Sequence, residues 1–324
     1  MEIRPRRNRQ SEVWRDLIQE NHLSVKNLMY PVFVMEGKNQ KVAITSMPGI
    51  YRFTLDLLLK EIEECLSLGI KSFALFAQIP EEKKDSIASE SYRAGNIFCQ
   101  AIQEIHTKFP DIIVMTDVAM DPYSSDGHDG IVKNGEILND ETLPILAKMA
   151  IAQAKAGSKM IGPSDMMDGR VEYLRKALDE AGFSHVGIMA YTAKYASAFY
   201  GPFRDALESA PKFGDKKTYQ MNPANSLEAI REAELDELEG ADFLMVKPAM
   251  PYLDIIQSLK NHSNLPIAAY QVSGEYAMLK AASQNGWLEN DQVMIESLMA
   301  IRRAGASVIL TYFAKEFALL NQTK

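Results

Sequence analysis

Short, continuous apolar runs alternate with longer amphipathic stretches along the whole chain. The runs are rich in β-branched residues and do not alternate with polar positions, which is typical of parallel strands buried on both faces. They lie at residues 30–35, 72–77, 111–120, 159–165, 186–193, 242–250, 266–274 and 307–314. We interpret each of these runs as a strand.

The stretches between the runs have helical periodicity. Residues 55–69 and 172–182 are two examples, and both end in glycine, which is a helix stop signal. Strands that alternate with helices in this way over roughly 250 residues predict a (β/α)₈ barrel of the α/β class. An open, doubly wound sheet is the alternative, but no Gly-x-Gly-x-x-Gly motif follows an early strand to support it.

Composition and charge exclude several classes of function. The chain has 324 residues, of which 47% are hydrophobic, and a net charge of -8, which argues against nucleic acid as the main partner. Its two cysteines are too few for a disulfide framework or a thiolate metal cage. No apolar stretch is long enough to span a bilayer, and the N-terminus lacks a hydrophobic signal core. We therefore expect a cytoplasmic protein that binds neither nucleic acid nor membrane.

The barrel interpretation places candidate active-site residues at the carboxyl ends of the strands, where the active sites of such barrels lie. Most of the apolar runs end in polar or ionisable side chains, namely Asp117, Ser164 with Asp165, Lys194, Lys247, Ser273 and Tyr312. A set of this kind that points into one barrel mouth predicts a catalytic site.

Lys194 and Lys247 are the most informative members of this set. Burial disfavours the charged form of a lysine, and repulsion between two neighbouring ammonium groups lowers the pKa further. The neutral amine that results attacks carbonyl carbons, so the pair predicts Schiff-base chemistry. The alternative is that each lysine reaches solvent or pairs with a nearby aspartate. The long, aromatic connection at about residues 195–225 predicts a lid over the barrel mouth.

Several segments resemble the porphobilinogen synthase family, also called 5-aminolevulinate dehydratase. They are "AYTAKYASAFYGPFRDA", "GADFLMVKPAMPYLDI", "TYQMNPAN", "YQVSGEYAM", "RRAGASVILTYFAK", "SMPGIYRFT", "ILNDET" and "PSDMMDGR". The resemblance covers nearly the whole chain. It implies a TIM barrel over residues 26–324, an N-terminal arm over residues 1–25, and a homo-octamer of arm-exchanging dimers. The implied reaction, part of tetrapyrrole and heme biosynthesis, condenses two 5-aminolevulinate molecules to porphobilinogen with loss of two waters.

The resemblance also implies roles for individual residues. Lys247 would form a Schiff base with the substrate that supplies the propionate side of the product, and Lys194 with the second substrate, near Asp117. Ser273 and Tyr312 would hold the first carboxylate. The remaining substrate-binding residues would be Ser164 at the site floor, Tyr200 and Phe203 as walls, and Arg204, Lys216 and Gln220 at the second carboxylate. Many relatives carry arginine at the position of Lys216, so a bidentate grip is not expected there.

The loop at residues 116–130 bears on the choice of metal. Zinc-using members of the family have cysteines at the positions of Ala119, Asp121 and Asp129. Zinc favours thiolate and imidazole ligands, so no catalytic zinc is expected. We interpret Asp121 and Asp129 as parts of a polar, partly solvated active-site loop. An active-site divalent ion, with His128 nearby, is the alternative.

An acidic stretch at residues 230–242 precedes the Lys247 run. Composition alone favours a solvated helix face. The resemblance implies instead an allosteric Mg²⁺ held by Glu232, with Asp168 in its outer sphere, because Mg²⁺ keeps several waters and takes only one or two carboxylates. Arginines of the arm at positions 6, 7 and 9 would then pack near this site on a neighbouring subunit.

Two other functions remain open from the sequence. A class I aldolase-like Schiff-base lyase also uses a strand-end lysine, but one lysine suffices for it. A non-catalytic oligomeric scaffold needs neither lysine, although the intact set of polar strand ends argues against it. Incubation with 5-aminolevulinate, followed by a colour test for the pyrrole, separates the three functions.

Overall fold

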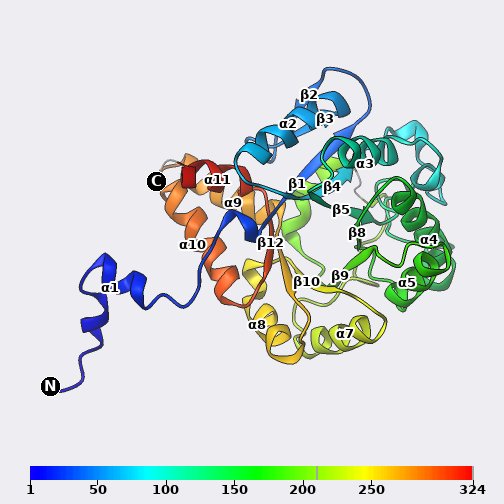
Figure 1. Cartoon of the computed structure of the whole chain (residues 1–324). Coiled ribbons are helices and arrows are strands. Elements are labelled where there is room, and N and C mark those ends of the chain that lie inside the picture. The colour runs from blue at the N-terminus through cyan, green and yellow to red at the C-terminus, as the bar shows by residue number, and fades with distance from the viewer. Residues whose placement is uncertain (209–210, 323–324) are drawn as a thin grey trace.

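The computed structural model describes residues 1–208 and 211–322, and within them eight parallel strands close into a barrel. The sheet order runs β12-β11-β10-β9-β8-β5-β4-β1, and pairing of β12 with β1 completes the circle (Figure 1). The strands are β1 (Leu28–Met35), β4 (Ser72–Ala77), β5 (Ile113–Val118), β8 (Met160–Pro163), β9 (Gly187–Lys194), β10 (Phe243–Lys247), β11 (Ile267–Gln271) and β12 (Val308–Thr311). Each overlaps one predicted run, so the predicted (β/α)₈ barrel is confirmed.

Helices surround the barrel and connect successive strands (Figure 1). The long ones are α2 (Leu55–Ser67), α3 (Ile97–Lys108), α4 (Asn139–Lys155), α5 (Arg170–Glu180), α7 (Leu227–Leu238), α8 (Leu253–His262), α9 (Ser273–Gln284), α10 (Asn290–Arg303) and α11 (Ala314–Gln322). Shorter helical pieces are η1 (Pro5–Arg9), α1 (Glu12–Leu17), η2 (Val25–Asn27), η3 (Glu81–Lys83), η4 (Ser89–Tyr92), η5 (Ala198–Tyr200), α6 (Gly201–Leu207) and η6 (Met250–Tyr252).

Helix α2 illustrates how the sequence produces one of these units. Leu58, Ile62 and Cys65 recur at helical spacing, and all three are buried. This apolar stripe faces the barrel, and its burial stabilises the helix more than intrinsic propensity does. The helix stops before Gly69, whose φ of 86° is favourable for glycine and turns the chain into β4.

The barrel strands are apolar without alternation because both faces are covered. All eight residues of β1 are buried. One face of the sheet meets side chains inside the barrel and the other meets the helices, so a polar residue in mid-strand would lose its hydration without compensation. Ionisable side chains are consequently placed near the strand ends, where the barrel opens, and a polar residue inside a strand has a partner, as Thr116 does in Gln153 at 2.7 Å.

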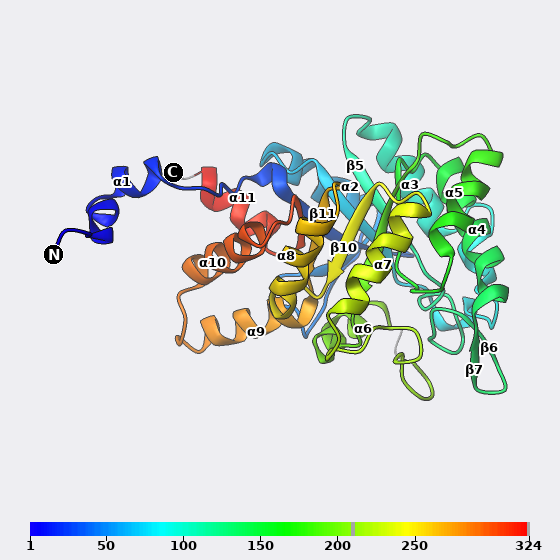
Figure 2. The ribbon, with the colours of Figure 1, turned by 90° about the horizontal axis from the view of Figure 1, so that it is seen from below.

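Two β-hairpins in the structure were not predicted. β2 (Lys41–Ala43) pairs antiparallel with β3 (Tyr51–Thr54), and β6 (Ile131–Lys133) pairs with β7 (Glu136–Leu138). The second hairpin turns through Asn134 and Gly135, with φ of 54° and 81°. An Asn-Gly pair between short apolar runs is the sequence signal for such a turn. This hairpin projects from the same end of the barrel as α6 (Figure 2).

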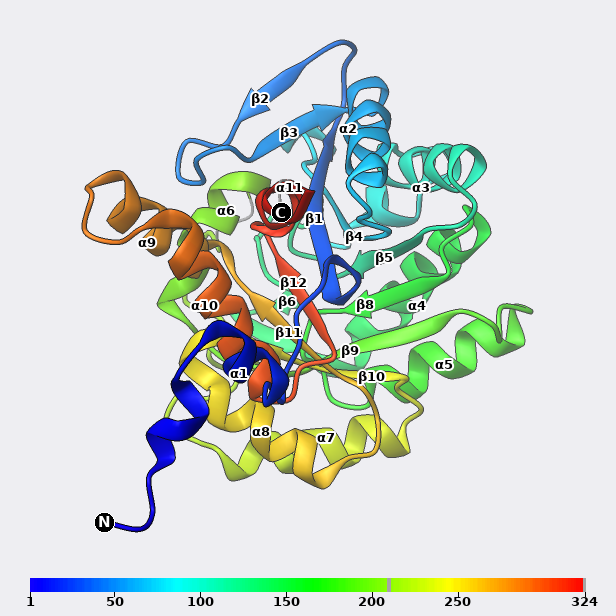
Figure 3. The ribbon, with the colours of Figure 1, turned by 60° about the vertical axis from the view of Figure 1, so that its left-hand side comes forward.

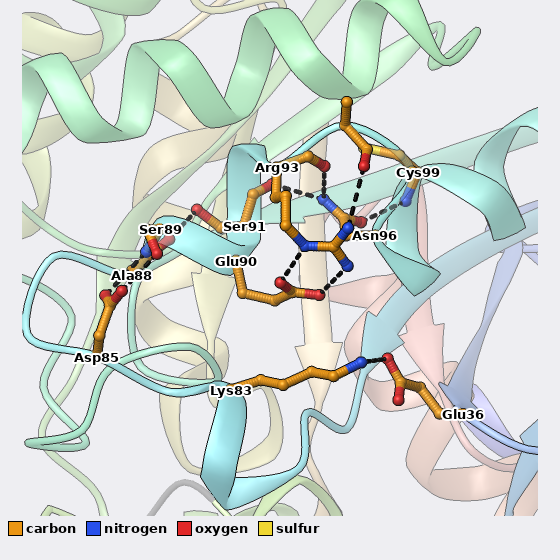
Figure 4. A network of polar contacts seen from close by, with 12 residues as sticks. Glu36, Lys83, Asp85, Ala88, Ser89, Glu90, Ser91, Arg93, Asn96 and Cys99 are labelled. Atoms are coloured by element: carbon orange, nitrogen blue, oxygen red, sulfur yellow. Dashed lines mark hydrogen bonds and ion pairs between the residues drawn. The ribbon is translucent and has the colours of Figure 1, made fainter.

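The connection from β4 to α3 is held by its own polar contacts (Figure 4). Glu90 accepts a hydrogen bond of 2.7 Å from Arg93, and Asn96 caps α3 by accepting from the backbone N–H of Cys99. Asp85 accepts from the hydroxyl of Ser89, and its backbone N–H donates to the carbonyl of Tyr123 at 3.2 Å. The connection therefore supports the loop at residues 121–129 from outside.

Residues 1–20 extend away from the barrel, and the chain rejoins it at Leu23, which packs against the core (Figures 2 and 3). Helix α1 exposes an apolar set: Val13 and Leu17 are 76% and 77% exposed, and Trp14 is 46% exposed. None of the helices in the described part of the chain has the length and apolar character needed to cross a membrane.

Candidate active site

Lys194 and Lys247 are neighbours at the barrel mouth. Each is the last residue of its strand, and the two are partners in the parallel register of β9 and β10. Their side chains are buried, with exposures of 5% for Lys194 and 6% for Lys247. The predicted pairing of two buried lysines at adjacent strand ends is therefore present in the structure.

The amine of Lys247 is surrounded by aromatic rings. Its Nζ lies 4.9 to 5.2 Å from the ring centres of Tyr270, Phe203, Tyr191 and Tyr200. Burial in this environment and the positive charge of Lys194 together lower the pKa of Lys247 to about 7, against the opposing effect of the Asp117 carboxylate. A substantial fraction of this amine is neutral at physiological pH.

Lys194 faces a polar wall instead. Its ammonium donates to the backbone carbonyl of Ser164 and lies 3.9 Å from a carboxylate oxygen of Asp129. The hydroxyl of Ser164 donates to Asp117 over 2.8 Å. Burial, with the charge of Asp121, raises the pKa of Asp117 to about 7, so this carboxyl can hold or release a proton near neutral pH.

The loop predicted to be polar and partly solvated is half-buried at Ser125 and Asp126, whereas Asp121 and Asp129 are buried. Both aspartates are at most 9% exposed, because the lid covers them. Lys216 reaches down from the lid and places its Nζ 3.1 Å from Asp121 and 2.7 Å from Asp129. Burial opposes ionisation of Asp129, but the ammonium groups of Lys194 and Lys216 outweigh it and lower the pKa of Asp129.

His128, from the same loop, contacts the lid twice. One ring nitrogen lies 3.0 Å from the carbonyl of Phe213, so it donates a hydrogen bond there; the other lies 3.1 Å from the hydroxyl of Tyr219. The neutral tautomer with its proton on Nε2 satisfies both partners. The ring also packs on Phe213 at 4.7 Å. His128 and Lys216 together fasten the lid to the loop.

The two ends of the lid are joined at the barrel mouth. The backbone N–H of Met221 donates to the carbonyl of Lys194, and that of Tyr195 donates to the carbonyl of Lys247, at 3.0 and 2.9 Å. The hydroxyl of Tyr200 donates to the same Lys247 carbonyl at 3.1 Å. These bonds tie the lid directly to both lysine-bearing strands.

The predicted carboxylate-binding residues lie at the ends of β11 and β12. Ser273 begins α9, and its hydroxyl lies 3.5 Å from the carbonyl of Phe199. Tyr312 shares a hydrogen bond of 2.9 Å with Tyr270, whose ring contacts Lys247. Both hydroxyls thus stand on the Lys247 side of the mouth.

The remaining predicted residues are Phe203, Arg204 and Gln220, and of these Phe203 lies beside Lys247. Phe203 packs edge-on against Phe76 at 5.1 Å and joins the rings around Lys247. Arg204, also on α6, is half-buried, and in the described part of the chain it has no ion-pair partner. Gln220 is buried beside a cavity on the outer side of the lid.

That cavity has a volume of about 860 Å³, and Glu232 and Asp168 are among the residues that line it. Burial, together with the nearby carboxylates of Asp236 and Asp168, raises the pKa of Glu232 to about 7, against the opposing positive charge of Arg170. A cation at this place would relieve the repulsion. Within residues 1–208 and 211–322, no three His, Cys, Asp or Glu side chains gather as a metal-binding group.

Sequence reasoning missed two residues of this region. Tyr191, whose ring centre lies 5.1 Å from the amine of Lys247 and 5.9 Å from that of Lys194, is predicted from the sequence only as part of an apolar strand. Glu275 is fully buried at the start of α9. It makes half of a capping box by accepting from the N–H of Val272, but valine at the N-cap lacks the hydroxyl that marks this motif in a sequence.

The sequence of this chain is similar to those of known proteins along nearly its whole length. A family model described as delta-aminolevulinic acid dehydratase matches residues 2–320. Delta-aminolevulinic acid dehydratase 1 of Arabidopsis thaliana, named as chloroplastic, is 55% identical over 317 residues, which cover 97% of this chain and 74% of the relative. The enzyme of that name from Chlamydia pneumoniae is 52% identical over 311 residues, with 96% and 94% covered.

A solved structure has nearly the same fold. It is delta-aminolevulinic acid dehydratase (porphobilinogen synthase) of Toxoplasma gondii in complex with its reaction product porphobilinogen. The TM-score is 0.97 at 50% sequence identity, and the match covers 99% of this chain and 92% of the other.

Proposed function

The chain belongs to the delta-aminolevulinic acid dehydratase family, and from that premise we propose that it condenses two 5-aminolevulinate molecules to porphobilinogen. The enzyme is a lyase, and two waters leave in the overall reaction. The observation that carries the proposal is the register pairing of Lys194 with Lys247, two buried amines at one barrel mouth. An aldolase-like lyase needs one such amine, and a scaffold needs none.

We propose that Lys247 is the first nucleophile. Its neutral amine attacks the ketone carbon of a substrate, the carbon–nitrogen double bond forms, and the ketone oxygen leaves as water. The hydroxyls of Ser273 and Tyr312 would hold that substrate's carboxylate, since both lie on the Lys247 side of the mouth. The ring environment excludes water, which protects the imine from hydrolysis.

Lys194 would form the second imine. Its ammonium must lose a proton first, and the Ser164–Asp117 pair beside it is suited to exchange one, because Asp117 has a pKa of about 7. Asp117 would also face the second substrate's amino group. Arg204, Lys216 and Gln220 would hold the second carboxylate, with Tyr200 and Phe203 as the pocket walls.

Lys216 would have to exchange partners for this role. Its ammonium is shared between Asp121 and Asp129. A substrate carboxylate that entered would compete with these two aspartates, while Arg204 is free of a carboxylate partner among the described residues. Arg204 is therefore the better prepared of the two cations.

Mg²⁺ is proposed as an allosteric ligand outside the active site. Glu232 would hold it directly and Asp168 through water, and the crowding of carboxylates in their shared cavity supports a cation there. Bound Mg²⁺ would supply positive charge and take no part in the condensation. No catalytic zinc is proposed, since Ala119, Asp121 and Asp129 offer no thiolate.

A homo-octamer of arm-exchanging dimers is proposed as the assembly. The exposed apolar set on α1 supports it, because such a surface on an extended arm is stabilised by burial against another copy. The plant relatives are named as chloroplastic, so a cytoplasmic location for this chain stays a prediction.

The activity has a direct test. Purified protein incubated with 5-aminolevulinate should form a product that reacts in the colour test for pyrroles. Lys194→Ala and Lys247→Ala should each abolish nearly all of it. Product formation that survives Lys194→Ala at the wild-type rate would favour a one-lysine mechanism, and no product from the wild type would refute the proposal.

A further inference from the structure

Glu275 occupies an unusual position at the barrel mouth. It is fully buried, yet it makes no ion pair in the described part of the chain. Its carboxylate accepts three backbone hydrogen bonds instead. Two come from Ala249 and Met250, at 3.2 and 2.6 Å, and one comes from Val272, at 2.6 Å. The donors belong to two different strand-to-helix connections.

The first connection leaves β10 directly after Lys247. The carbonyl of Lys247 is fixed by Tyr195 and Tyr200, and Pro248 has no N–H to donate. The next two backbone N–H groups are those bound by Glu275. The backbone that leaves the reactive lysine is thus held at the Lys247 carbonyl and at the next two N–H groups, and Glu275 binds both of those N–H groups.

The second connection leads from β11 into α9. Glu275 caps the helix by accepting a hydrogen bond from the backbone N–H of Val272. Ser273 lies between these two residues in the chain. The same oxygen, Oε2, accepts from both Val272 and Ala249. One carboxylate therefore joins the backbone that carries Ser273 to the backbone that carries Lys247.

We propose that Glu275 is a positioning residue that sets the span between the amine of Lys247 and the hydroxyl of Ser273, and so selects the length of the keto acid that bridges them. The inference rests on the proposed function, in which one substrate forms an imine with Lys247 and places its carboxylate at Ser273. A substrate one methylene longer or shorter would not fill a fixed span with both ends bound.

The test uses two keto acids that differ by one methylene, 4-oxopentanoate and 5-oxohexanoate. Each is trapped on Lys247 by borohydride, and adducts are counted by mass spectrometry in wild type, Glu275→Gln and Glu275→Asp. Glutamine keeps the size but turns a donor toward one of the bound N–H groups, and aspartate is too short to reach both connections. Glu289→Gln is the matched control, because Glu289 caps α10 through Asp291 and Gln292 and contacts neither connection.

Wild type and Glu289→Gln should trap 4-oxopentanoate in clear preference to 5-oxohexanoate. Both Glu275 variants should trap 4-oxopentanoate about tenfold more slowly and lose most of the preference. A merely structural role would lower the yield for both acids equally and leave the ratio unchanged, which would overturn the proposal. No adduct on Lys247 in wild type would refute the proposed function instead.

A measurement on the unaltered protein covers the case in which a variant does not fold. Amide protons of Ala249 and Met250 should exchange with solvent as slowly as those of the barrel strands, because a buried carboxylate binds them. Exchange at the rate of exposed loops would show that the clamp does not hold in solution and would overturn the inference.

Discussion

The environment of each lysine determines what its amine can do. Lys247 lies among aromatic rings, and in the described part of the chain it has no carboxylate within ion-pair distance. Lys194 lies near Asp129 and the Ser164 carbonyl. The two lysines are partners in the strand register, but the surroundings of Lys247 are less polar than those of Lys194. Lys247 is therefore better suited to act as a nucleophile, and Lys194 is better suited to exchange a proton.

This difference predicts a pH dependence. The folded pKa of Lys247 is about 7, below the usual value for lysine, so the reactive neutral amine is lost as pH falls through 7. The rate of imine formation at Lys247 should drop about tenfold per pH unit on the acid side and level off on the alkaline side. Borohydride trapping at a series of pH values measures it, with circular dichroism to show that the fold persists. A rate that kept rising up to about pH 10, the pKa of an ordinary lysine, would contradict the environment described.

Single residues also show where prediction from sequence reached its limit. The two lysines, Asp117 and the strand-end hydroxyls were found because a polar residue after an apolar run is a local signal. The contacts of Lys216 with Asp121 and Asp129 were not found, since they join positions 95 and 87 residues apart in the chain. The exposure of the aspartate loop depends on the lid above it, which no local pattern reports.

At the level of elements, the start of α9 is the junction between the lid and the barrel. Gly274 lies so close to the lid that a Cβ there would be 2.4 Å from the carbonyl oxygen of Phe199 and 2.7 Å from its Cα. Only a residue without a side chain lets η5 rest on the helix start. Ser273, Gly274 and Glu275 thus contact, in order, the lid, the lid again and the exit of β10.

Gly274→Ala should therefore displace the lid. The new methyl group would push the backbone of Phe199 outward and take Tyr200 away from the Lys247 carbonyl, so kcat/KM should fall by at least about tenfold. Gly187→Ala is the matched control, since its Cβ would meet its nearest neighbour at 3.6 Å, an ordinary contact. The test is to measure kcat/KM for both variants by steady-state kinetics. Wild-type kinetics in Gly274→Ala would mean that the lid does not rest on this glycine.

Elements differed in how well the sequence predicted them. The barrel strands were found because burial on both faces makes them continuously apolar, and helices such as α2 because their stripes and terminal glycines are local. The hairpins β2–β3 and β6–β7 were missed, since strands of only three or four residues carry no long periodic pattern. The Asn134-Gly135 pair was the available signal for the second.

For the whole molecule, the arm and the Glu232 cavity are the features that the barrel fold leaves unexplained. The arm exposes apolar side chains, and the cavity gathers carboxylates beside the outer surface of the lid. If an arm from another copy and a Mg²⁺ ion meet at this cavity, metal binding, assembly and lid order become linked equilibria. A ligand bound only by the assembled form, at about 100 times its dissociation constant, stabilises that form by about 2.7 kcal/mol per site.

Glu232→Ala tests this linkage. After thorough chelation, Mg²⁺ should raise the octamer fraction and the activity of the wild type, and it should do neither in Glu232→Ala. Glu234→Ala is the matched control, because Glu234 lies exposed on the same helix and does not line the cavity. Sedimentation velocity and activity assays with and without Mg²⁺ supply the readout. An equal response in wild type and Glu232→Ala would remove Glu232 from the proposal.

The central claim is that two buried lysines form imines with 5-aminolevulinate, and its most direct measurement is covalent. The protein is incubated with 5-aminolevulinate, reduced with borohydride and digested, and modified peptides are identified by mass spectrometry. Adducts should appear on Lys247 and Lys194, while Lys280, paired with Glu316 at 2.6 Å, should stay unmodified. Adducts spread over exposed lysines, or a Lys247→Ala variant that turns over substrate at the wild-type rate, would contradict the claim.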